Sequence, residues 1–278
     1  PATIRLAPLI TPTSTDRLVV IMDQVALAPD GTLLEEYRYR WFQNGSEMVD
    51  LISDSVSSFR TRKHDEWKVT VSPVEFPTVV SSATVVVGNS APTLELAMRN
   101  PMPTTLDDLD VDAKTSDFDE DVLAITYDWT VDGGATAQTS SSVEAAKTTA
   151  GEQWTVQVTV VDDDGAQATA EMGVAIINTP PSIVSVDLSP QPAVTTDVLT
   201  VDTETVDPDG DSVELAYTWR VNGQQVTSGN ADFLDGMFFD KGDFIDVIVS
   251  SSDSIGAGES AQSTVVFIQN SPPELLGV

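Results

Sequence analysis

The sequence of 278 residues contains no cysteine, a single histidine, and 13 Lys and Arg against 44 Asp and Glu. Without cysteine, neither disulfides nor thiolate metal sites can hold the fold together. His64 lies in the charged run Arg62-Lys63-His64-Asp65-Glu66, which is typical of a solvated turn. No serine has the context of a nucleophile elbow, and there is no phosphate-binding glycine loop or zinc-type His or Cys set. These absences predict that the chain is not an enzyme.

The charge is strongly one-sided, with a net value of −31 and a pI near 4.1. Such a field repels nucleic acid and anionic lipid and attracts cations, so nucleic-acid binding is not expected. There is no run of 18 apolar residues and no basic-apolar leader, so we expect no membrane span in this segment and place any signal or anchor outside it. An extracellular or cell-surface domain without disulfides often uses bound calcium instead.

The sequence repeats itself three times. A boundary motif recurs as PATI, APTL, PPSI and PPEL, starting at Pro1, Ala91, Pro180 and Pro272. The last three follow a hydrophobic strand that ends in Asn, at positions 89, 178 and 270. Two further markers keep the same register: Trp41, Trp129 and Trp219, and Trp67, Trp154 and Ile245. We therefore divide the chain into repeat 1 (1–90), repeat 2 (91–179) and repeat 3 (180–270), with 271–278 as the start of a truncated fourth repeat.

Within a repeat, the hydrophobic pattern has the two-residue period of β-strands. In repeat 3 it predicts strands at 183–188, 198–206, 213–221, 225–227, 244–250 and 263–268, separated by turns at DPDGD, VNGQ and SIGAG. About seven short strands at this spacing predict an all-β fold of three tandem Ig-like β-sandwiches in an extended array. The recurring Trp of the third strand is expected in the core. Segments 51–59 and 143–148 could hold a helical turn at most.

Two repeats carry an acidic loop ten residues before the core Trp. These loops are Asp207-Pro-Asp209-Gly-Asp211 in repeat 3 and Asp117-Phe-Asp119-Glu-Asp121 in repeat 2. Alternating carboxylates around a tight turn offer several hard oxygen ligands, as Ca²⁺ requires. An acid also recurs eight residues after the second marker, as Glu75, Asp162 and Asp253. Asp163, Asp164 and Asn178 lie where they could complete a site near a domain junction.

Two other readings of the acidic loops remain open: a simple polar turn, because turns favour Asp, Pro and Gly, and a salt-adapted acidic surface. The first repeat distinguishes them in part. Its loop, Ala28-Pro-Asp30-Gly-Thr32, keeps only the middle acid, and its net charge is −3, from 11 acids and 8 bases. Repeats 2 and 3 carry −14 (17 acids, 3 bases) and −13 (15 acids, 2 bases). The excess charge follows the intact loops, which favours bound cations.

The boundary Asn-x-Pro-Pro, the Asp-Pro-Asp-Gly-Asp before Tyr-x-Trp and the Asp-Asp-Asp-Gly after a late strand resemble the polycystic-kidney-disease-type and cadherin-like Ig modules of bacterial surface proteins. Such modules serve as stalks, adhesin segments and spacers beside catalytic domains, and many are stiffened by calcium. The resemblance implies metal-binding positions at Asp207, Asp209, Asp211 and Asp253, and at Asp117, Asp119, Asp121 and Asp162. It also implies partners among neighbouring repeats.

Three hypotheses for function follow. The first is a non-catalytic stalk, spacer or filament-forming segment, stiffened by calcium and able to self-assemble. The second is an adhesin that binds a glycan or protein through repeat 1, which holds eight of the thirteen basic residues: Arg5, Arg17, Arg38, Arg40, Arg60, Arg62, Lys63 and Lys68. The third is an accessory module of a larger secreted enzyme.

Overall fold

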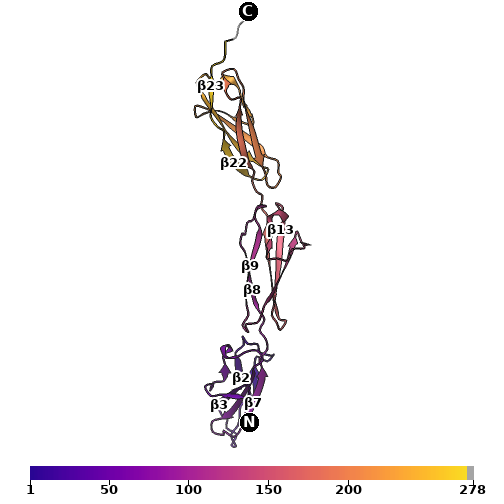
Figure 1. The fold of residues 1–278 in the computed structure, drawn as a ribbon. Helices are drawn as coiled ribbons and strands as arrows, with labels where there is room; N and C mark the ends of the chain where they lie inside the picture. The colour runs from indigo at the N-terminus through magenta and orange to yellow at the C-terminus, as the bar shows by residue number, and fades with distance from the viewer. Residues whose placement is uncertain (274–278) are drawn as a thin grey trace, which may run out of the picture.

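The computed structural model describes residues 1–273, and the final residues of the expected fourth repeat, 274–278, lie outside this range. The chain forms three β-sandwiches that follow one another in an extended array (Figure 1). Side chains alternate between the two faces of each strand, as the sequence pattern predicts. In β13 (Gln153–Val161), Trp154, Val156, Val158 and Val160 are buried and the residues between them are not. Burial of this apolar face against the second sheet is what stabilises each sandwich.

Repeat 1 consists of two antiparallel sheets, with strand orders β1-β2-β5 and β4-β3-β6-β7. The strands are β1 (Thr3–Ala7), β2 (Leu18–Gln24), β3 (Tyr37–Gln43), β4 (Ser46–Met48), β5 (Ser55–Val56), β6 (Glu66–Pro73) and β7 (Ser81–Val86). A short 3₁₀ turn, η1 (Ser58–Arg60), precedes β6.

Repeat 2 has the same plan, with strand orders β12-β9-β8 and β11-β10-β13-β14. Its other strands are β8 (Thr93–Met98), β9 (Leu109–Ser116), β10 (Ala124–Val131), β11 (Gly134–Ala135), β12 (Ser142–Val143) and β14 (Gln167–Ala175). The 3₁₀ turn η2 (Ala145–Lys147) follows β12. The sequence allowed at most a helical turn in segments 51–59 and 143–148; η1 overlaps the end of the first segment and extends to Arg60, and η2 lies within the second.

Repeat 3 has one sheet of order β15-β17-β20 and a larger one of order β16-β23-β21-β18-β19, with β22 paired to β21. The strands are β15 (Ser182–Ser189), β16 (Ala193–Val194), β17 (Leu199–Val206), β18 (Glu214–Val221), β19 (Gln224–Gly229), β20 (Phe233–Leu234), β21 (Phe244–Ser252), β22 (Ala257–Gln262) and β23 (Val266–Gln269). The 3₁₀ turn η3 (Gly236–Phe238) follows β20.

The recurring tryptophan of the third strand lies in the core of each sandwich, as predicted. Trp41, Trp129 and Trp219 are 0%, 1% and 1% exposed. Each indole N–H donates to a backbone carbonyl, on Ser53, Ser140 and Ala231 respectively. In repeats 1 and 2 a second tryptophan packs edge-on against the first, with ring centroids 6.2 Å apart. The satisfied N–H group lets a large ring be buried without an unpaired donor.

The expectation of a turn through SIGAG is wrong in its second half, where the chain forms β22 instead. This polar, small-residue segment is a strand because it pairs antiparallel with β21. It also passes close to the start of the repeat, where a Cβ added to Gly258 would lie 2.1 Å from the carbonyl oxygen of Pro181 and 2.5 Å from the Ser251 hydroxyl. The N–H of Glu259 donates to that same carbonyl at 3.3 Å. Only glycine permits this close approach, which fastens the late strand to the start of the repeat.

The helical segments within residues 1–273 are single 3₁₀ turns, and none of them is long and apolar enough to cross a membrane.

Candidate metal centres at the repeat junctions

The acidic loops connect the second and third long strands of repeats 2 and 3. Each begins with a turn in which the first aspartate accepts a hydrogen bond from the backbone N–H two residues later. Asp119 N–H donates to Asp117 Oδ1 at 2.7 Å, and Asp209 N–H donates to Asp207 Oδ1 at 2.8 Å. The next residue, Glu120 or Gly210, has a positive φ of 62° or 77°. This tight bend turns alternate carboxylates toward one side of the loop.

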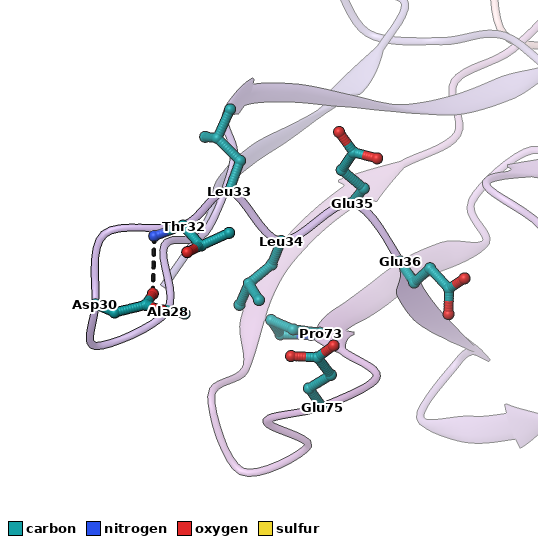
Figure 2. Close-up of a pocket in the computed structure, with 9 residues that line it drawn as sticks. All are labelled: Ala28, Asp30, Thr32, Leu33, Leu34, Glu35, Glu36, Pro73 and Glu75. Carbon is teal, nitrogen blue, oxygen red and sulfur yellow. Dashed lines mark hydrogen bonds between the residues drawn. The ribbon is translucent and has the colours of Figure 1, made fainter.

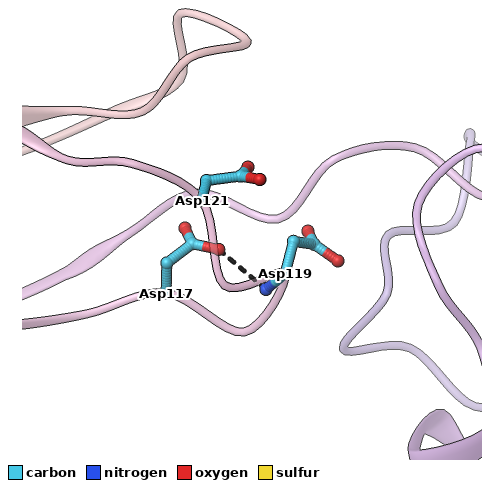
Figure 3. A group of neighbouring side chains, drawn as sticks. All are labelled: Asp117, Asp119 and Asp121. Atoms are coloured by element: carbon cyan, nitrogen blue, oxygen red, sulfur yellow. Dashed lines mark hydrogen bonds between the residues drawn. The ribbon is translucent and has the colours of Figure 1, made fainter.

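The structure brings each predicted triad together. Figure 3 shows Asp117, Asp119 and Asp121 around the loop of repeat 2. One carboxylate oxygen of each lies within 4.8 Å of the others, and the same holds for Asp207, Asp209 and Asp211. Three negative charges at this separation repel one another strongly unless a cation lies between them. Within residues 1–273, the one other group of this kind is Asp121 with Asp163 and Asp164.

The linker between two repeats binds directly to the acidic loop that follows it. Ser90 N–H donates to Asp119 Oδ2 at 2.8 Å, and Thr179 N–H donates to Asp209 Oδ2 at 2.6 Å. The preceding residue is the recurrent asparagine: Asn89 in the first linker, Asn178 in the second. The two triads therefore lie at the junctions between repeats, where a bound ion would contact both the linker and the acidic loop of the following repeat.

Several oxygen atoms at these junctions are buried and accept no hydrogen bond from the described residues. At the first junction they are Asn89 Oδ1, Asp117 Oδ2, Asp119 Oδ1 and Asp121 Oδ2. At the second they are Asn178 Oδ1, Asp207 Oδ2 and Asp209 Oδ1. A buried acceptor without a donor is costly, and the recurrence of three of these four oxygens at the second junction indicates a shared cause. All are hard oxygen donors, the ligand type that Ca²⁺ prefers, so the residues fit a divalent cation.

Asp162 and Asp253, predicted as metal ligands, lie beside the triads and hold the linker asparagines. Asn89 Nδ2 donates to Asp162 Oδ2 at 2.7 Å, and Asn178 Nδ2 donates to Asp253 Oδ2 at 2.8 Å. Because a carboxylate only accepts, this bond fixes the amide orientation and leaves the asparagine carbonyl oxygen as the free acceptor. The other oxygen of each aspartate accepts backbone N–H groups of its own loop.

These hydrogen bonds lower the pKa of both aspartates. The bond from Asn178, followed by those from Gly256 and Ile255, holds the pKa of Asp253 below its ordinary value. For Asp162, burial raises the pKa, but the bonds from Asn89 and the loop N–H groups outweigh it and the pKa is again lowered. Both groups are therefore charged at neutral pH and anchor the linker as carboxylates.

A lysine from repeat 1 enters the first junction. Lys63 Nζ donates to Asp164 Oδ2 at 2.6 Å and to Asp121 Oδ1, and it lies 3.5 Å from Asp163 Oδ1. The hydrogen bond to Asp121, followed by the bond to Asp164, raises the pKa of the Lys63 ammonium above its ordinary value, against the effect of burial. Sequence reasoning placed Lys63 in a solvated turn and did not connect it with the second repeat.

The carboxylates in and near the degenerate loop of repeat 1 do not converge on one point. Asp30 accepts a hydrogen bond from the Thr32 N–H at 3.0 Å and lies on the rim of a pocket. In Figure 2 the carboxylates of Glu35, Glu36 and Glu75 point in different directions around this pocket. Within residues 1–273 they form no group of converging ligands, in contrast to the two junction triads.

Asn89 is the junction residue that the sequence analysis noted only as a boundary marker. The signal for its role was present in the sequence, because an asparagine follows the last strand of all three repeats, at positions 89, 178 and 270. His64, the single histidine, is exposed and occupies the turn before β6 with a φ of 70°. Its backbone N–H donates a hydrogen bond to Val87 O, which stabilises the turn.

No protein-family model and no curated protein sequence matches this chain. Solved structures that align with it include three N-terminal domains of the bacteriophage RB49 highly immunogenic outer capsid protein, with 15% identity, 98% of this chain and 100% of that chain covered, and a TM-score of 0.33. Titin domains A168–A170 align with 11% identity, 97% and 99% coverage and a TM-score of 0.43. A structure of a 1.5-MDa bacterial ice-binding adhesin aligns with 12% identity, 98% coverage of both chains and a TM-score of 0.28.

Proposed function

We propose that this chain is a non-catalytic, extracellular stalk or spacer segment in which a divalent cation, Ca²⁺, stiffens the two junctions between repeats. The observation that carries the proposal is the set of buried oxygens without donors, contributed at each junction by the linker asparagine and the acidic loop of the following repeat. An ion bound to both would restrict bending between neighbouring sandwiches. This is the role that the polycystic-kidney-disease-type and cadherin-like resemblance suggests.

Calcium fits the arrangement better than magnesium. Ca²⁺ accepts six to eight oxygens in flexible geometry, whereas Mg²⁺ requires a near-ideal octahedron and keeps several of its waters. The ligands here come from a loop and a linker that belong to different repeats. A mixed set of carboxylate and amide oxygens from two bodies suits the less demanding ion.

A calcium titration followed by differential scanning calorimetry tests the proposal. At a free concentration of 100 times Kd, one ion that binds only the folded state adds about 2.7 kcal/mol. For a domain of this size each kcal/mol raises Tm by roughly 4–8 °C. We expect the Tm of repeats 2 and 3 to rise when CaCl₂ is added and to fall back to its starting value with EDTA. The rise in Tm with MgCl₂ should be smaller. Melting curves that coincide in CaCl₂ and EDTA would refute the cation sites.

An adhesive role for repeat 1 is the second candidate, and one surface favours it. The outer face of the β4-β3-β6-β7 sheet contains a groove of about 510 Å³ lined by Arg38, Arg40, Phe42 and Ile52 among others. Arg40 pairs with Glu47 and lies 5.7 Å from the centroid of the Phe42 ring. Among the described residues Arg38 has no ion-pair partner and is exposed. A free guanidinium and an aromatic ring that line the same groove suit an acidic glycan.

Binding of sulfated or sialylated glycans by the full chain tests this second candidate. Arg38→Ala is expected to abolish most of the signal on a glycan array, because it removes the free guanidinium. The control is Arg99→Ala, which removes an exposed arginine of repeat 2 that is paired with Asp112. Equal binding by the two variants, or none by the unmodified chain, would exclude the groove as an acidic-glycan site.

A further inference from the structure

The two junctions differ in one respect: the first contains an ammonium group and the second does not. Lys63 extends from the loop between η1 and β6 of repeat 1 into repeat 2, where it contacts Asp121 in one loop and Asp163 and Asp164 in another. Its side chain is 21% exposed and that of Asp121 is 5% exposed. This ion-pair cluster therefore links one loop of repeat 1 with two loops of repeat 2.

Equivalent positions in successive repeats can be identified from one backbone hydrogen bond. In this bond the donor lies before the sixth strand of the repeat and the acceptor directly follows the last strand: His64 N–H donates to Val87 O at 2.7 Å, and Gly151 N–H donates to Ile176 O at 2.8 Å. The residue before the donor is Lys63 in repeat 1 and Ala150 in repeat 2. Where the first junction has an ammonium group, the second has a methyl group.

The acids that Lys63 contacts change together with it. Asp164 in repeat 2 and Ile255 in repeat 3 are equivalent, because each donates its N–H to the Oδ1 of the aspartate two residues earlier. The residues before them are Asp163 and Ser254. The second junction has thus lost the lysine and two of its three acidic partners, while it keeps the triad and the linker asparagine. The joint absence of the lysine and of these two acids, where the rest of the junction is the same, indicates that Lys63, Asp163 and Asp164 act as a unit.

We propose that Lys63 is a built-in latch that holds the first junction even when no divalent cation is bound, so that removal of calcium loosens the second junction and leaves the first fixed. A partly buried ammonium among three carboxylates is screened less by solvent and salt than an exposed pair. Lys63 uses Asp121 Oδ1 and leaves Oδ2 as a free acceptor, so the latch and a bound ion are compatible. The expected flexibility of the second junction rests on the proposed calcium function; the latch itself does not.

Spin-label distances across each junction test the latch in the full chain, which has no native cysteine to interfere. Arg38, Thr126 and Ala216 occupy equivalent exposed positions, each three residues before the core tryptophan. Arg38→Cys with Thr126→Cys reports on the first junction, and Thr126→Cys with Ala216→Cys reports on the second. Double electron–electron resonance then gives the width of each distance distribution in CaCl₂ and in EDTA.

In EDTA we expect a narrow distribution across the first junction and a broad one across the second. Adding Lys63→Ala should broaden the first distribution in EDTA, whereas Lys68→Ala, which removes an exposed lysine of β6, should leave it narrow. The latch is refuted if the first distribution broadens in EDTA as much as the second, or if Lys63→Ala leaves it narrow. Failure of CaCl₂ to narrow the second distribution would instead count against the proposed function and would leave the Lys63 comparison intact.

Discussion

Replacing Trp129 with alanine is expected to destabilise repeat 2 by about 3–5 kcal/mol, the usual cost of deleting a large buried aromatic. The side chain is 1% exposed, packs edge-on against Trp154 and donates its indole N–H to Ser140 O at 2.8 Å. Truncation opens a cavity between the two sheets and leaves that carbonyl without its donor. Urea denaturation of the full chain, followed by the fluorescence of the remaining tryptophans, should show the unfolding of this repeat at a lower midpoint.

Val122→Ala is the matched control, because Val122 belongs to the same repeat but is 79% exposed. Substitutions at such positions usually change the free energy of unfolding by less than about 0.5 kcal/mol. If Trp129→Ala lowered the urea midpoint of all three repeats equally, they would unfold as one cooperative unit. A midpoint for Trp129→Ala equal to that of the control would contradict its place in the core.

The all-β fold was predictable because the constraints that produce it are local and occur three times. Period-two alternation and a tryptophan in the third strand each describe a strand buried on one side, and their repetition in register excludes coincidence. The β22 strand was not predictable in the same way. It pairs with the preceding strand β21, but its residues are small and polar and show no apolar alternation. Its close approach to Pro181, which Gly258 allows, spans most of the repeat, so no local pattern reveals that contact.

The candidate sites show the same division between local and distant determinants. Carboxylates at alternate positions around a turn must lie near one another, so the triads of Asp117 and Asp207 with their neighbours could be inferred from spacing alone. The sequence could also place an acid beside each loop, at Asp162 and Asp253. It could not show that this acid holds the linker asparagine, because the pairing depends on how two strands end in space.

The contact of Lys63 with the second repeat was beyond reach for a further reason. Lys63 is separated from Asp121 by 58 residues and from Asp164 by 101, and the contact depends on how two independently packed sandwiches meet. Within its own repeat the lysine follows Arg62 in a charged turn, and such turns are generally solvated. The absence of a lysine at the equivalent Ala150 acquires meaning only when both junctions are compared in three dimensions.

The strongest effect of a single substitution on cation binding is expected at Asp209. Its Oδ2 accepts the Thr179 N–H at 2.6 Å, and its Oδ1 is a buried acceptor without a donor. Asp209→Asn retains a carbonyl oxygen to accept the linker bond but removes one charge from the triad. We expect repeat 3 to lose most of its calcium-dependent rise in Tm.

In EDTA the same substitution should raise the Tm of repeat 3 above that of the unmodified chain, because one source of carboxylate repulsion is gone. The variant would then have the higher Tm of repeat 3 in EDTA and the lower Tm in CaCl₂. Simple destabilisation cannot produce this reversal. Asp30→Asn, at the corresponding position of the degenerate loop in repeat 1, is the control and should leave both melting curves of repeat 3 unchanged. A full calcium response in Asp209→Asn would show that the carboxylate triad is not the cation site.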